Sequence, residues 1–171
     1  MKPNASNRYH ATPYDISATG FYFDTLEEYQ TRAAEHRNEY GDPVEEYEIQ
    51  FIDGDNYRLF DAIGVNQANL KDWFERFEDM DDDDAVKLII LIEHFGYSVE
   101  DAVDRIKDLH LFEGTAIQYA EELIDSTGML DQMPENLRYY FDTEAFARDM
   151  VLGGDITEVE IDGHTYIADG V

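Results

Sequence analysis

The sequence predicts an α+β fold made of three small domains in a row. Helix and strand patterns mix before about residue 60, helical patterns alone follow to about residue 107, and helices then lead into a C-terminal hairpin. We therefore expect an N-terminal α/β domain over residues 1–60, a central all-helical domain over 61–107 and a C-terminal α+β domain over 108–171.

The N-terminal domain is predicted from one helix between two strand-like segments. Residues 1–11 are polar and are expected to form a loose extension, and Gly20–Asp24 has β-type composition. Thr25-Leu-Glu-Glu28 can cap the first turn of a helix reciprocally, and this helix is expected to run to about Tyr40. In Glu46–Asp53 apolar and polar residues alternate, which predicts a half-buried strand.

The central domain is predicted from helical signals without a strand pattern. Apolar residues over 70–77 keep a period of 3.6. Ala85–Phe95 has the composition of an apolar helix that ends at Gly96, and Ser98 is placed to cap a short helix after it.

The C-terminal domain begins with a second capping box, Thr115–Gln118, whose helix is expected to end at Gly128. Asp142 is placed to cap a last helix. The segments 156–162 and 164–168 are joined by an Asp-Gly pair, which predicts a β-hairpin.

The charge balance narrows the choice of partner. The chain has forty Asp and Glu residues and only twelve Lys and Arg residues, which gives a formal net charge of −28. A nucleic-acid-binding protein needs the opposite sign to neutralise phosphates, so DNA and anionic membranes are excluded as direct partners. An apolar fraction of 43% argues for folded cores rather than disorder. The composition favours a basic protein surface as the partner.

No pattern in the chain predicts catalysis, a metal site or a cofactor. The chain has no cysteine, and its five histidines are scattered without metal-ligand spacing. Phosphate-binding glycine loops and nucleophile motifs are absent. The N-terminus lacks the apolar core of a signal peptide, and the longest apolar run, Leu88–Ile92, is too short to span a bilayer. We expect a soluble, cytoplasmic protein that is not an enzyme.

Four consecutive aspartates, Asp81–Asp84, precede the apolar helix. They do not fit a calcium-binding EF-hand loop, because Val86 stands where that loop needs glycine. The run predicts a helix start capped by Asp82 or Asp83, with Asp84 in the first turn. One cap explains one or two aspartates and leaves the others without a local role.

Carboxylates also recur at helical spacing, as in Glu100, Asp104 and Asp108. Like charges so placed destabilise a helix by about 0.2–0.5 kcal/mol per pair, so a chain selected only to fold would intersperse cations. Side chains three or four residues apart lie about 5–6 Å apart at Cβ, and such rows can approximate a row of DNA phosphates. The candidate partner-binding residues are Glu45, Glu46, Glu48, Asp72, Glu75, Asp79, Asp82, Asp83, Glu100, Asp101, Asp104, Asp108, Glu121, Glu122 and Asp125.

The acidity has alternative origins that the sequence leaves open. Adaptation to high salt also raises Asp and Glu, but it usually comes with a weak core, whereas this chain keeps ten Phe and twelve Tyr. The surface could be acidic only for solubility. The chain could also be an acidic adaptor for another basic DNA-binding or histone-like protein, or a salt-adapted enzyme with a defined cleft.

Over about residues 12–168 the chain resembles the ArdA-type antirestriction proteins, which mobile elements carry. The resemblance rests on the order and spacing of aromatic, acidic and small residues, and no single motif decides it. The segments concerned are Gly20-Phe-Tyr-Phe, Leu26-Glu-Glu-Tyr29, Glu45-Glu-Tyr-Glu-Ile49, Tyr119–Gly128, Pro134–Asp142 and Glu144–Asp149.

The resemblance implies a DNA mimic that binds Type I restriction–modification enzymes in place of DNA, without catalytic residues or a cofactor. It also implies an elongated, curved homodimer joined through the C-terminal domains. In the family, the stretch matching Leu130–Asp142 is associated with the antirestriction motif near the dimer contact. The dimer-interface candidates here are Leu137, Tyr139, Tyr140 and Phe141, for which ordinary core packing is an equally open alternative.

Overall fold

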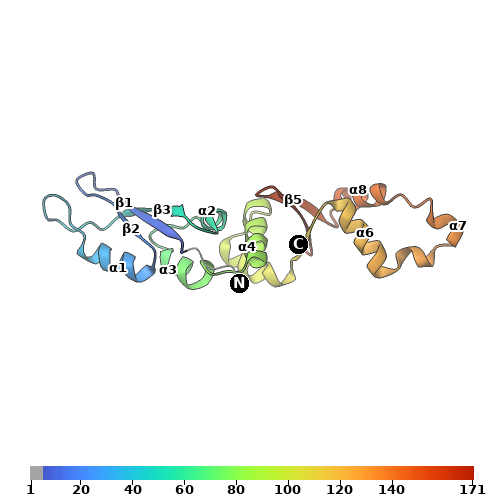
Figure 1. The fold of residues 1–171 in the computed structure, drawn as a ribbon, viewed down its shortest axis with the longest axis horizontal. Coiled ribbons are helices and arrows are strands. Elements are labelled where there is room, and N and C mark those ends of the chain that lie inside the picture. The colour runs from blue at the N-terminus through green and yellow to red at the C-terminus, as the bar shows by residue number, and fades with distance from the viewer. Residues whose placement is uncertain (1–5) are drawn as a thin grey trace. The chain divides into compact units, whose positions relative to one another are not determined.

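The structure is a computed structural model that describes residues 6–171 (Figure 1). The chain divides into two compact units, the first ending at Ala85 and the second beginning at Val86. Each unit contains one three-stranded antiparallel sheet and several helical segments. The predicted α+β class is therefore confirmed. The three-domain division and the elongated outline stay predictions.

The sheet of the first unit has the strand order β2-β1-β3. The two strands predicted near residues 20–24 and 46–53 are confirmed, and a third strand lies between them in the sheet. The bounds are β1 (Arg8–Pro13), β2 (Phe21–Phe23) and β3 (Tyr47–Asp53).

The expected loose extension over residues 1–11 is wrong for residues 8–11, which belong to the central strand β1. Tyr9 and Ala11 are fully buried, whereas Arg8 is exposed and His10 is half-buried. This alternation of buried and exposed residues is the pattern of a strand with one covered face. It was missed because the residues around it are polar. The part of the expected extension in residues 1–5 lies outside the described residues.

Helix α1 (Leu26–Glu35) begins at the predicted cap, where the side-chain oxygen of Thr25 accepts a backbone N–H of the first turn. The helix ends five residues before the expected Tyr40. The chain leaves the helix at His36, because the His36 ring stacks on Tyr47 of β3 and its Nδ1 lies 2.9 Å from the Tyr47 hydroxyl. A tertiary contact thus overrides the local helical pattern.

Residues 61–107 contain helical segments and no strand, as the sequence predicts, but the helices are shorter and less regular than expected. Two segments are π-helical, closed by the bonds from Glu78 N to Trp73 O and from Phe95 N to Ile90 O. The elements are α2 (Tyr57–Ile63), α3 (Leu70–Asp72), η1 (Trp73–Phe77), α4 (Asp82–Ile89), η2 (Ile90–His94), α5 (Val99–Arg105) and η3 (Ile106–Asp108).

In the second unit the strand order is β4-β6-β5. The predicted capping box at Thr115, the cap at Asp142 and the C-terminal hairpin are all confirmed. Strand β4 was not predicted, because four residues give too short a pattern. The elements are β4 (His110–Glu113), α6 (Ala116–Thr127), η4 (Met129–Gln132), α7 (Glu135–Arg138), α8 (Thr143–Gly153), β5 (Thr157–Ile161) and β6 (His164–Asp169).

Helices α1 and α3 lie on the same side of the first unit's sheet (Figure 1). The strand residues on that face, among them Tyr9, Phe23 and Ile49, are buried. Residues on the opposite face, such as Tyr22 and Gln50, are exposed. The first unit is therefore two layers thick, with its core between the sheet and the helices.

Candidate functional site

Carboxylates are spread over the surfaces of both units. Of the forty Asp and Glu residues, thirty-five are exposed and five are half-buried. All fifteen predicted partner-binding carboxylates are among the exposed residues. Their binding role stays a prediction, but each of them is available to a partner. The half-buried residues are Asp15, Asp24, Glu78, Asp84 and Asp169.

Helix α6 presents the predicted row most regularly. Glu121, Glu122 and Asp125 are exposed, and the same helix buries Ala120 and Ile124. The helix is α-helical over twelve residues with complete caps at both ends, so the expected 3.6 period is preserved. Its three carboxylates therefore lie on a common solvent-facing side.

The row at Asp72, Glu75 and Asp79 is less regular than predicted. Asp72 ends the short helix α3, Glu75 lies in the π-helical segment η1, and Asp79 follows that segment. The wider π turn changes the angle between successive side chains, so a single α-helical face does not hold all three. Lys71 lies 3.6 Å from Glu75 in an exposed ion pair, which contributes little to stability.

The aspartate run begins helix α4, but its cap is not the residue expected. The Asp81 side chain accepts the backbone N–H of Asp84 at 3.0 Å, so Asp81 is the cap rather than Asp82 or Asp83. The cap thus lies one or two residues earlier in the run than predicted. Asp82 and Asp83 are exposed in the first turn, and Asp84 is there as predicted. Carboxylates in a first turn complement the positive end of the helix dipole.

Helix α5 carries Glu100, Asp101 and Asp104 on its exposed surface. Asp101 also accepts the Ser98 hydroxyl at 2.7 Å at the predicted cap. Asp108 lies in the 3₁₀ segment η3, outside the helix that was expected to carry it. Three of these four carboxylates therefore share one α-helix.

The carboxylates of Glu45, Glu46 and Glu48 come from the segment that enters β3. Hydrogen bonds to the backbone carbonyls of Glu45, from Gln67, and of Glu46, from Tyr14, fix the path of the chain. Glu48 lies on the exposed face of the strand. The backbone is thus held while all three side chains stay in solvent.

A polar cluster in the first unit was not predicted. Trp73 Nε1 donates to the Tyr9 hydroxyl at 2.8 Å, and this hydroxyl donates to Glu78 Oε1 at 2.8 Å. The Asn7 amide lies 3.4 Å from the same oxygen and accepts the backbone N–H of Asp55 through its Oδ1. The cluster ties β1 to the helical segment that carries Glu75.

Burial dominates the ionisation of this cluster. Burial raises the pKa of Tyr9 well above its ordinary range, and it raises the pKa of Glu78 despite the hydrogen bonds from Tyr9 and Asn7. The only sequence signal was the single tryptophan, whose buried N–H needs an acceptor. We interpret the cluster as a positioning device beneath the acidic surface.

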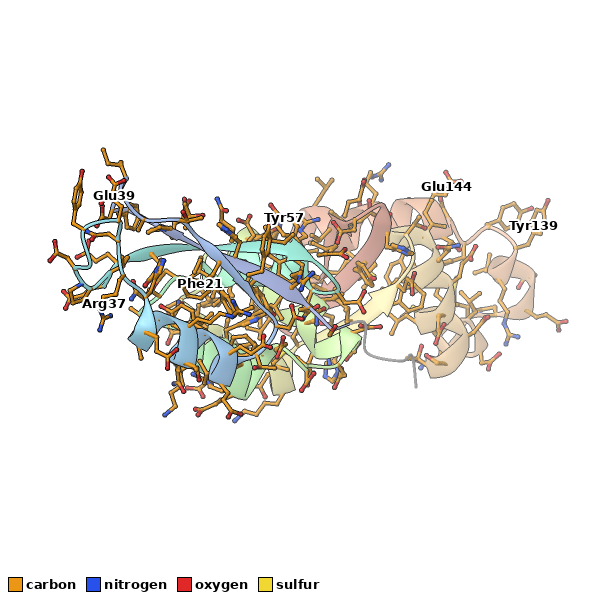
Figure 2. The ribbon with its side chains drawn as sticks, turned by 60° about the vertical axis from the view of Figure 1, so that its left-hand side comes forward. Phe21, Arg37, Glu39, Tyr57, Tyr139 and Glu144 are labelled. Carbon is orange, nitrogen blue, oxygen red and sulfur yellow. The ribbon has the colours of Figure 1, made fainter. Side chains whose placement is uncertain are left out.

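The predicted dimer-interface candidates differ in exposure. Tyr139 is 89% exposed, Tyr140 78% and Leu137 46%. Figure 2 shows Tyr139 extending away from the ribbon. Phe141 is half-buried, and its ring packs on Phe146 of α8 at 5.6 Å between centroids. Three of the four side chains are thus available for a contact, and Phe141 supports α8.

Within residues 6–171, no three His, Asp or Glu side chains are grouped to hold a metal ion. No helix of the described chain is long and apolar enough to cross a membrane.

Two comparisons with known proteins complete the description. A protein-family model described as "Antirestriction protein (ArdA)" matches residues 9–165, which is nearly the whole chain. No curated protein matches the chain significantly.

Proposed function

The chain belongs to the ArdA antirestriction protein family, and we propose that it inhibits Type I restriction–modification enzymes by occupying their DNA-binding groove as a mimic of DNA. The observation that carries the proposal is the exposure of all fifteen predicted carboxylates, which come from both units. A groove that binds DNA is basic, and carboxylates in rows offer it the charge that phosphates offer. No cofactor and no catalytic step are needed.

If the protein competes with DNA for a basic groove, its binding affinity should depend on salt concentration. Double-stranded DNA binds basic proteins with the release of condensed counterions, so its affinity falls steeply with salt. An acidic protein that engages the same lysines and arginines releases the anions bound there. Affinity spread over many ion pairs depends little on any one of them, because exposed pairs contribute about 0–1 kcal/mol each.

We further propose that the protein acts in the cytoplasm as a homodimer joined through the surface around Leu137, Tyr139 and Tyr140. Large exposed aromatic side chains are enriched in protein interfaces. Replacing both tyrosines by serine is expected to shift the protein toward monomer in sedimentation experiments without loss of fold. If the variant sediments with the same dimer mass as the parent, this surface is not part of the dimer interface.

A restriction assay tests the proposed function. Purified protein is mixed with a Type I enzyme and unmethylated target DNA, and cleavage is followed as the protein concentration rises. We expect inhibition that added DNA relieves. Cleavage that persists at saturating protein contradicts the proposal.

A matched variant sharpens this assay. In the triple variant Glu121→Gln, Glu122→Gln and Asp125→Asn the shape of α6 is kept while three charges are removed. Weaker inhibition is expected from the triple variant and a much smaller change from each single substitution. If a histone-like protein is retained in a pull-down and restriction subunits are not, the acidic-adaptor alternative replaces the proposal.

A further inference from the structure

Two loops meet at one end of the first unit's sheet. One joins β1 to β2 and the other joins α1 to β3. Arg37 and Glu39 mark the second loop in Figure 2. We call residues 14–18 and 37–42 together the loop tip.

Hydrogen bonds connect the two loops directly. The Asn38 amide donates to Asp15 Oδ2 at 2.9 Å, and the backbone N–H of Glu39 donates to the carbonyl of Ser17 at 3.0 Å. The Asn38 side-chain oxygen also accepts the backbone N–H groups of Tyr40 and Asp42. These bonds restrict both loops to one arrangement before any partner arrives.

Asp15 organises the first loop. Its Oδ1 accepts both the backbone N–H and the hydroxyl of Ser17, and its carbonyl accepts the N–H of Ala18 to close a turn. The hydrogen bonds from Ser17 and then from Asn38 lower the pKa of Asp15. Ile16 therefore stands at the second position of a fixed turn.

The side chains that the loop tip presents are unexpectedly apolar. Ile16 is fully exposed, at 103% of its reference area, and Tyr40 and Tyr14 are 75% and 67% exposed. Single exposed apolar residues are ordinary. Here, however, three come from two loops that are hydrogen-bonded to one another, and none of them packs in the core. Their exposure contributes nothing to folding, and they cannot imitate phosphates.

Carboxylates outnumber cations beside this apolar group in the chain. Glu39, Asp42, Glu45 and Glu46 are all exposed on the second loop and its continuation toward β3, where Arg37 is the one exposed cation. An apolar centre with an acidic rim is complementary to a recess in a basic protein surface. A DNA duplex or an anionic membrane would be repelled by the same rim.

We propose that the loop tip is an apolar anchor that inserts Ile16 and Tyr40 into a recess of the basic enzyme surface which the protein inhibits. The proposal rests on the proposed function, and it adds to the binding affinity an apolar contribution that DNA phosphates cannot make. Rigid aromatic and aliphatic anchors carry much of the affinity in protein interfaces. Because this part is apolar, it persists at salt concentrations that weaken the ionic part.

The decisive variant is Ile16→Asp, which adds a negative charge at the loop tip. If charge alone drives binding, the added carboxylate leaves the affinity for a basic groove unchanged or raises it. If Ile16 is an anchor, the variant weakens binding by about tenfold, the effect of losing roughly 1.4 kcal/mol at an interface hot spot. Tyr40→Ser provides a second variant that leaves the charge unchanged.

The control is Leu152→Asp, which adds the same charge at a 77% exposed aliphatic side chain in the second unit. The affinity of each full-length variant for a purified Type I enzyme is measured across a series of salt concentrations. Circular dichroism confirms the fold. We expect Tyr40→Ser to weaken binding by a similar factor at every salt concentration and Leu152→Asp to bind like the parent. Ile16→Asp is expected to weaken binding most at high salt, where the attraction of its added charge is screened.

Three outcomes would overturn the anchor. Parent-like or tighter binding of Ile16→Asp together with parent-like binding of Tyr40→Ser rejects it, while binding of the parent leaves the proposed function intact. A loss of affinity that accompanies dissociation of the protein's own dimer assigns the loop tip to self-association instead. If the parent protein does not bind the enzyme at all, both proposals fail together.

Discussion

The core of the first unit is rich in aromatic rings, whereas the buried core of the second consists of aliphatic residues, most of them alanine and isoleucine. Tyr9, Phe23 and Trp73 are at most 1% exposed in the first unit. In the second unit the fully buried residues are small or aliphatic, such as Ala120 and Ile167, and the two most exposed tyrosines are on its surface. The first core therefore combines large rings with aliphatic side chains, and the second core has aliphatic side chains alone.

The two cores differ in what they contribute against the charge repulsion of the acidic surface. Repulsion among exposed carboxylates opposes folding in both units. In the first unit the Tyr9 ring contacts Phe23, Phe51, Phe60 and Phe74 at centroid distances of 5.3 to 5.9 Å. These contacts add to the burial of apolar area and offset the repulsion. The comparison predicts that substitutions in the first core have the larger effects.

The largest effect is expected from Trp73→Ala. Removing a fully buried tryptophan lowers the free energy of unfolding by about 3–5 kcal/mol, and here it also leaves the Tyr9 hydroxyl without its donor. Denaturant unfolding measures the change. Ile167→Val in the second core is the comparison, with an expected loss of about 0.5–1.5 kcal/mol. Equal losses at the two positions would break the contrast between the cores.

Tyr9→Phe is expected to come next. The substitution keeps the ring, but it leaves the Trp73 N–H without its acceptor and removes the Tyr9 donor from the Glu78 carboxylate, which keeps the Asn7 amide. Leaving a buried donor unsatisfied costs about 1–3 kcal/mol. Tyr29→Phe is the matched control, because the buried Tyr29 hydroxyl makes no hydrogen bond of normal geometry within residues 6–171, although Gln67 lies near it. The control is expected to be neutral in thermal unfolding. Similar losses in both variants would show that the hydroxyl network contributes nothing.

A smaller, pH-dependent effect is expected from Glu78→Gln. Burial raises the pKa of Glu78 in the folded state, so the folded protein binds a proton more readily than the unfolded chain. Stability from this group is fully present below the ordinary glutamate pKa and is lost as pH rises through the raised one. Glutamine keeps an acceptor for Tyr9 without the charge.

The measurement for Glu78→Gln is the free energy of unfolding as a function of pH. Relative to the parent, the variant is expected to gain stability as pH rises from acid toward neutral. Glu122→Gln, at an exposed position, serves as the control with a pH profile like the parent's. A Glu78→Gln profile parallel to that of the parent would mean that the carboxylate is not perturbed by burial.

The smallest effect is expected from neutralising one exposed carboxylate. Glu121→Gln should change the free energy of unfolding by no more than about 0.5 kcal/mol, and inhibition of a Type I enzyme only slightly. A single such substitution that abolished inhibition would contradict a surface that acts through many weak pairs.

Local signals in the sequence predicted the parts of the fold that local chemistry decides. The caps at Thr25, Ser98, Thr115 and Asp142 are present, because each uses a side chain within three residues of the N–H it satisfies. The hairpin at Asp162-Gly163 is present, because both residues adopt positive φ values of 50° and 82°. These features need no information from distant segments.

Features that depend on distant contacts were missed. Strand β1 was not predicted, because Tyr9 and Ala11 alone are too few apolar residues to give a strand pattern in a polar stretch. The strand forms because it pairs with β2 and β3 on either side. The early end of α1 depends on His36 meeting Tyr47. For the candidate site, residue type predicted exposure correctly, but the π and 3₁₀ segments changed the spacing in two of the predicted rows.

The most direct test of DNA mimicry is the salt dependence of binding to a Type I enzyme, measured side by side for this protein and for unmethylated target DNA. We predict that the logarithm of the affinity falls linearly with the logarithm of salt concentration for both, and that each displaces the other. An affinity of the protein that does not change with salt, or a complex that holds DNA and protein together, would contradict the account.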